Sequence, residues 1–113
     1  MSQTQSEIKI EVSLDDNKRP ESIRWTADGA DGPVSNNSKG MLVSFFDANT
    51  KETFKLDLWT NELQVAEMDR FMFQTLRGLT ETYHKATGNT ELSNQMRSFV
   101  QHFGEKTLII PTT

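Results

Sequence analysis

The sequence has no cysteine among its 113 residues, which excludes disulfide bonds, thiolate catalysis and cysteine-ligated zinc sites. It also has no apolar run close to the roughly 20 residues that a membrane-spanning helix needs. The first ten residues, MSQTQSEIKI, contain no basic segment followed by an apolar run, so we expect no signal peptide. These absences predict a cytoplasmic protein without membrane insertion.

Basic residues are fewer than acidic ones: 12 Lys and Arg stand against 16 Asp and Glu, which gives a formal net charge of -4. No basic stripe stands out along the chain. Nucleic acids bind clustered Lys and Arg, so we expect no nucleic-acid partner. The same charge balance argues against binding to an anionic membrane surface.

Residues suited to catalysis or metal binding are sparse. The two histidines, His84 and His102, have no second ligand at metal-binding spacing, and a structural or solvent-facing role fits both better. Ser44 and Thr75 have no evident base partner, and no G-x-S-x-G motif is present. We therefore expect no enzyme activity, no cofactor and no metal site.

Strand signals come first in the chain. Alternating apolar and polar residues, or a short apolar run, predict four strands: Ile8–Leu14, Ile23–Ala27, Met41–Phe46 and Phe54–Trp59. Short polar turns favour antiparallel pairing in a meander. The polar segment 28–40, DGADGPVSNNSKG, predicts a long mobile loop, and residues 1–6 are expected to be disordered.

Helix signals follow. Apolar residues recur every three or four positions from Val65 to Leu79, which predicts a helix from about Gln64 to Ala86 that ends at Gly88. Glu67 stands where the acid of a capping box belongs, although Asn61 or Thr60 could cap instead of Gln64.

A second apolar stripe predicts another helix. Asn89 or Thr90 caps it, Gly104 ends it, and residues 107–111 form a β-prone tail. This order predicts an α+β fold over residues 1–113 as a single domain: a four-stranded antiparallel meander followed by two helices packed on one face.

Five aromatic residues are candidates for protein interaction: Phe45, Phe46, Trp59, Phe71 and Phe73. Neighbouring residues of a strand face opposite sides of a sheet, and residues two apart on a helix point away from each other. One small core therefore cannot bury all five. Either a partner covers the surplus, most simply another copy in a homodimer or higher even oligomer, or loops and the tail around residues 108–110 cover it.

Four pieces occur in order along the chain: SEIKIEVSLDDNKRPESIRW, FKLDLWTNELQVAEMDRFMFQTL, ATGN and MRSFVQHFGEK. They resemble the gliding motility-associated GldC family over almost the whole chain, although Gln64 stands where the family pattern leads us to expect threonine. The resemblance implies a soluble, non-enzymatic accessory of the gliding machinery or its associated secretion apparatus. It carries over no catalytic residue.

The order of four strands followed by two helices is also similar to the SecB-like export chaperones. This similarity concerns topology alone, and a fold does not determine a function. It implies an alternative: an oligomeric holdase whose apolar surfaces hold unfolded proteins destined for export.

Overall fold

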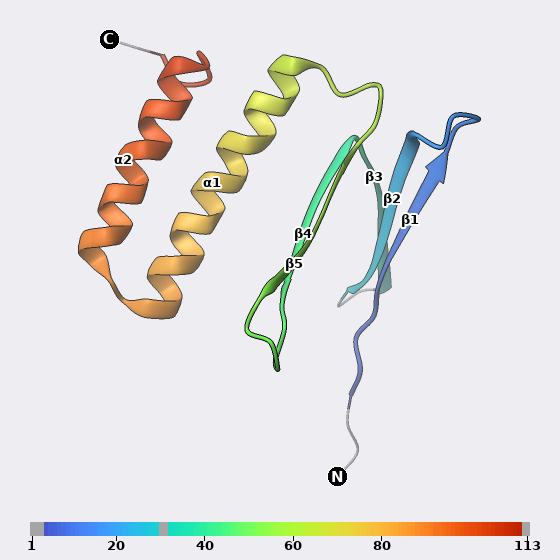
Figure 1. The fold of residues 1–113 in the computed structure, drawn as a ribbon, viewed down its shortest axis with the longest axis horizontal. Coiled ribbons are helices and arrows are strands. Elements are labelled where there is room, and N and C mark those ends of the chain that lie inside the picture. The colour runs from blue at the N-terminus through green and yellow to red at the C-terminus, as the bar shows by residue number, and fades with distance from the viewer. Residues whose placement is uncertain (1–3, 30–31, 112–113) are drawn as a thin grey trace. The chain divides into compact units, whose positions relative to one another are not determined.

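The computed structural model describes residues 4–29 and 32–111. The chain forms two compact units, one ending at Leu63 and the other beginning at Gln64. The first unit contains the strands and the second contains both helices, drawn from blue to green and from yellow to red in Figure 1.

The N-terminal unit holds two antiparallel sheets. Strands β1 (Ile8–Leu14), β2 (Pro20–Gly29) and β3 (Gly32–Ser38) pair in that order, and β4 (Gly40–Phe46) pairs with β5 (Thr53–Trp59). The α+β class and the antiparallel pairing are confirmed. The predicted single sheet of four strands is wrong, because the unit has five strands in sheets of three and two.

The additional strand lies in the segment predicted as a loop. β2 extends to Gly29, and β3 pairs with it so that Ala27 lies opposite Val34 and Ile23 opposite Ser38. The loop prediction is therefore wrong for residues 28–29, 32–38 and 40, while residues 30–31 lie outside the described residues. Asn and Ser usually favour turns. Here the polar segment forms a strand at the edge of the sheet because its backbone pairs with β2.

At the N-terminus, residues 4–6 carry no helix or strand. The rest of the segment predicted to be disordered, residues 1–3, lies outside the described residues.

The three-stranded sheet has one apolar face, as the alternation predicts. Ile10 lies opposite Trp25 and Val12 opposite Ile23, while Glu11 and Arg24 lie opposite each other on the other face. Ile23 is fully buried, whereas the outer residues of this face are more exposed.

The β4–β5 hairpin follows β3 directly through Lys39. At one end the Thr60 N–H donates to the Lys39 carbonyl oxygen (2.8 Å), and at the other the Asp47 N–H donates to the Glu52 carbonyl oxygen (2.8 Å). The Asp47 carboxylate accepts from the backbone N–H of Thr50 and of Asn49 within the turn, and these bonds hold the pKa of Asp47 below its ordinary value.

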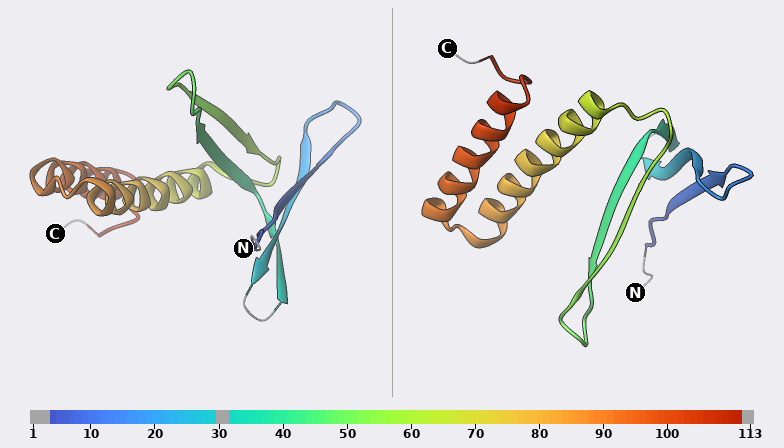
Figure 2. Two further views of the ribbon diagram at one scale, coloured as in Figure 1. Left: turned by 90° about the horizontal axis from the view of Figure 1, so that it is seen from below. Right: turned by 45° about the horizontal axis from the view of Figure 1, so that its top comes forward.

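The C-terminal unit is a pair of helices, α1 (Val65–Thr87) and α2 (Thr90–Lys106), which lie side by side in Figure 1 and in the right-hand view of Figure 2. The predicted ends are largely confirmed. The Glu67 carboxylate accepts from the Gln64 N–H (3.1 Å), Gly88 ends α1 with φ 69°, and the Asn89 side chain accepts from the Leu92 N–H (3.1 Å).

Gly104 does not end α2, which continues to Lys106. It is buried, and its carbonyl oxygen accepts from the N–H groups of Ile109 (2.9 Å) and Ile110 (3.0 Å), so the tail folds back as turns instead of forming a strand. A Cβ at position 104 would lie 2.6 Å from both Ile110 Cδ1 and Phe73 Cε1. A side chain at this position would therefore have to displace Ile110 and Phe73.

The helices bury Phe73 and Thr80 of α1 against Ser93, Val100 and Gly104 of α2. The side of α1 with the most buried residues is therefore offset from the predicted stripe, whose end members Val65 and Leu79 are exposed. Neither unit by itself tests the prediction that both helices pack on one face of a sheet, so this stays a prediction.

We expect Gly104→Ala to destabilise the protein by roughly 1 kcal/mol. Overpacking costs about 1–3 kcal/mol, and the better helix propensity of alanine returns about 1 kcal/mol. Gly78→Ala is the matched control, because Gly78 is exposed within α1 and its added Cβ meets nothing within 4 Å. It should stabilise by about 0.5–1 kcal/mol.

Urea unfolding of both variants checks this expectation. A Gly104→Ala protein as stable as Gly78→Ala would show that Ile110 and Phe73 do not pack closely against position 104.

Candidate functional site

Ionisable residues do not converge on a metal or catalytic centre in the part of the chain that the structure describes. No group of three or more His, Asp or Glu there could hold a metal ion. His102 is exposed on α2. His84 is half-buried in the last turn of α1, and its Nδ1 has no hydrogen-bond partner among the described residues. Among the same residues, no helix is both long enough and apolar enough to span a membrane.

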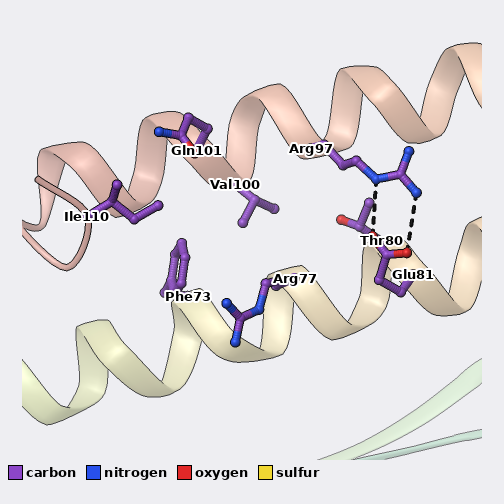
Figure 3. A pocket seen from close by; sticks show the side chains of 8 residues that line it. All are labelled: Phe73, Arg77, Thr80, Glu81, Arg97, Val100, Gln101 and Ile110. Atoms are coloured by element: carbon purple, nitrogen blue, oxygen red, sulfur yellow. Dashed lines mark hydrogen bonds and ion pairs between the residues drawn. The ribbon is translucent and has the colours of Figure 1, made fainter. Parts of the chain in front are cut away.

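A cleft of about 250 Å³ opens along one side of the helix pair. Figure 3 shows Arg97 of α2 reaching Glu81 of α1 across it. Arg97 Nε donates to Glu81 Oε1 (3.1 Å) and Nη2 donates to Oε2 (3.3 Å), which makes the pair bidentate. The Arg77 guanidinium stands 5.4 Å from the centre of the Phe73 ring. The Arg97–Glu81 pair links the two helices, whereas the Arg77–Phe73 contact lies within α1, and neither brings a nucleophile and a base together.

A second hollow of the helix pair is apolar. It measures about 360 Å³ and we call it the apolar groove; its lining residues are Leu76, Leu79, Thr80, Leu92, Gln95, Met96, Phe99 and Val100. Thr80 and Val100 also line the charged cleft, so they lie between the two hollows. The helix pair thus has a charged side and an apolar side.

Aromatic side chains gather on the β4–β5 hairpin, which we call the aromatic ribbon. Phe45 lies opposite Phe54, so these two share one face, and Phe46 and Trp59 lie on the other. Exposed fractions are 61% for Phe45, 68% for Phe46, 63% for Phe54 and 54% for Trp59. The ribbon therefore presents aromatic surface on both faces.

Three of the five predicted interaction residues lie on this ribbon: Phe45 and Phe46 at its turn end and Trp59 at the opposite end. The other two lie on α1, where Phe71 is half-buried and Phe73 is only 6% exposed in the core of the helix pair. Phe73 consequently offers almost no surface to a partner. The part that the remaining four play in binding stays a prediction.

Phe54 belongs to the ribbon although sequence reasoning did not select it. In the sequence it has no adjacent aromatic residue, and its position beside Phe45 depends on the pairing of β4 with β5. The signal that could have identified it is the short polar turn of residues 47–52, which sets the hairpin register.

A third hollow, of about 340 Å³, lies within the N-terminal unit. Arg19 and Pro20, where β2 begins, line it together with Asp57, Leu58, Trp59 and Asn61 at the end of β5. The exposed indole of Trp59 is therefore next to a polar rim, an arrangement common at protein-binding surfaces.

A family model described as gliding motility-associated protein GldC-like matches residues 20–109. No curated protein and no solved structure matches the chain. The matched range contains the aromatic ribbon and both helices, and β1 lies outside it.

The hydrogen bond from Arg97 holds the pKa of the Glu81 carboxyl below its ordinary value. Because the unfolded chain lacks this bond, the stabilisation is present above the unfolded pKa and is lost as the pH falls through the folded pKa. We expect a carboxyl NMR titration to give a lower pKa for Glu81 in the folded protein than in urea. Arg97→Gln should remove most of that difference, and an unchanged Glu81 pKa in the variant would show that the pair does not form in solution.

Proposed function

This chain belongs to the GldC-like family of gliding motility-associated proteins, and from that premise we propose that it is a non-enzymatic interaction protein of the gliding apparatus or of its associated secretion machinery. The family match covers residues 20–109 of the 113. The family description names a process and no reaction.

The aromatic ribbon is the observation that supports a binding role most directly. An aromatic side chain can bury about 150–250 Å² on association, and aromatic residues are enriched at protein interfaces. Four of them are more than half exposed on the ribbon. A two-stranded hairpin is also only marginally stable alone, so an added partner would stabilise it.

The proposal extends to partner class and location. The net charge of -4 favours protein partners over nucleic acid. We propose that the protein works in the cytoplasm, where cell fractionation should recover it, and that it needs no cofactor or metal.

Self-association is part of the same proposal. Among the described residues, the buried hydrophobic ones are Ile23, Phe73 and Val100, and many more large hydrophobic side chains are exposed. A homodimer or a higher even oligomer would cover such surface by using one patch on both copies.

The apolar groove of the helix pair favours a second candidate function, that of a SecB-like holdase. Its volume of about 360 Å³ and its leucine, methionine and phenylalanine lining suit an extended apolar segment. A holdase would keep this groove open to many unfolded clients, whereas an adaptor would bury its apolar surface in one interface.

We expect the double variant Phe45→Ser/Phe46→Ser, placed in the chromosome, to reduce colony spreading and to lose binding partners in pull-down. Each substitution removes an exposed ring from a different face of the ribbon, so the folding free energy should change little. Val65→Ser is the matched control, because Val65 is 81% exposed and belongs to α1, not to the ribbon.

Normal spreading and unchanged partners in the double variant would overturn the role of the ribbon, and normal spreading after gene deletion would overturn the link to gliding. Suppression of the aggregation of an unfolded model protein by purified wild-type chain, lost on Leu79→Ser and Phe99→Ser in the groove, would favour the holdase instead.

Sedimentation of the purified protein at micromolar concentration should show a dimer or a higher even oligomer. A stable interface of this kind buries at least about 1,000 Å². A monomer at every accessible concentration would contradict self-association and would leave the ribbon to a different protein.

A further inference from the structure

Strand β5 has an open edge. Its sheet consists of β4 and β5, so among the described residues β4 is its ladder neighbour. The Thr60 N–H and the Glu52 carbonyl oxygen both bond to the β4 side of the hairpin. Hydrogen-bonding direction alternates along an antiparallel strand. Residues 54, 56 and 58 therefore face β4, and the backbone groups of residues 53, 55, 57 and 59 point outward.

We propose that a second copy of this chain pairs with that edge, β5 against β5 and antiparallel, with Leu56 on the two-fold axis. The product is a continuous sheet in the order β4–β5–β5–β4. This inference rests on the self-association proposed above. It adds which strand forms the interface and in which register the two copies pair.

The hydrogen-bonding pattern limits the possible registers. Outward-facing residues must lie opposite outward-facing residues for donors to meet acceptors, so a two-fold axis has to pass through a residue. The central candidates are Lys55, Leu56 and Asp57. An axis through Lys55 places lysine opposite lysine, and an axis through Asp57 places aspartate opposite aspartate, which is unfavourable.

The axis through Leu56 is the arrangement that pairs opposite charges. It places Lys55 opposite the partner's Asp57, and symmetry repeats the pair on the other side of the axis. Both side chains are available for this, because Lys55 and Asp57 are 57% and 51% exposed and their 3.7 Å ion pair lies on one face of the strand. The order Phe-Lys-Leu-Asp-Leu of residues 54–58 is thus self-complementary under a two-fold.

The same register also aligns the apolar residues. Leu56 meets the partner's Leu56, and Phe54 meets the partner's Leu58, all on the face that carries Phe45. The apolar face of the ribbon would thus continue across the axis over four strands. β4 is a weaker candidate edge, because its sequence GMLVSFF has no charge to specify a register.

A charge-swap experiment tests the register. Lys55→Asp and Asp57→Lys, taken singly, place like charges opposite each other at two positions, so each should associate with itself roughly tenfold more weakly than the wild type by sedimentation. An equimolar mixture should form a heterodimer, because every cross-axis pair is then of opposite sign. Lys9→Asp makes the same charge change on exposed β1 and should leave association unchanged.

Disulfide trapping gives an independent test, since the chain has no cysteine of its own. In the Leu56→Cys variant, the two introduced thiols would face each other across the axis. Their residues would form a non-hydrogen-bonded pair with Cα atoms about 4.5 Å apart, within disulfide range. This variant should therefore give a covalent dimer on mild oxidation. Leu58→Cys is the matched control, because its two copies would lie about 13 Å apart along the strands and should not cross-link.

The outcomes separate this inference from the broader proposal. A dimer whose Leu56→Cys variant fails to cross-link, or cross-links no faster than Leu58→Cys, overturns the register and leaves self-association standing. Failure of the two charge variants to associate when mixed also overturns the register. A wild-type monomer at all concentrations overturns both.

Discussion

The antiparallel ladder between β4 and β5 is the constraint on which the candidate surface depends. Because side chains alternate along each strand, Phe45 must lie with Phe54 and Phe46 with Trp59 on the opposite face. A two-stranded sheet cannot bury its own side chains, so each face stays exposed unless another element or a partner packs on it. The exposed aromatic surface is therefore a consequence of backbone hydrogen bonding, and the proposed binding role follows from it.

The same ladder separates two kinds of chemistry along β5. The residues whose backbone groups bond to β4 carry apolar side chains; they are Phe54, Leu56 and Leu58. Lys55 and Asp57 have charged side chains, and their backbone groups point outward. Charge at a sheet edge usually discourages pairing with another chain. Opposite charges two residues apart have a different effect, because they favour one partner: an identical strand in one register.

In the helix pair, one side is organised by charge and the other by apolar residues. The Glu81–Arg97 pair and the close approach of Phe73 to Gly104 link α1 to α2, while Leu76, Met96 and Phe99 line the apolar groove. The spacing of apolar residues was enough to predict both helices. It could not show that Phe73 is a core residue, because Phe73 packs next to Gly104 of α2, which is distant in sequence.

By itself the sequence determined the local structure: one-faced strands, both helices, the Glu67 and Gly88 helix ends, and the family. These follow from periodicity and from residue preferences within a few positions of each site. Only the tertiary structure decided that β3 is a strand, that Gly104 lies inside α2 and that Phe54 belongs to the ribbon. Each of these depends on a contact with another segment of the chain. A polar strand needs β2 to pair with, Gly104 needs Phe73 and Ile110 beside it, and Phe54 needs Phe45 across the hairpin.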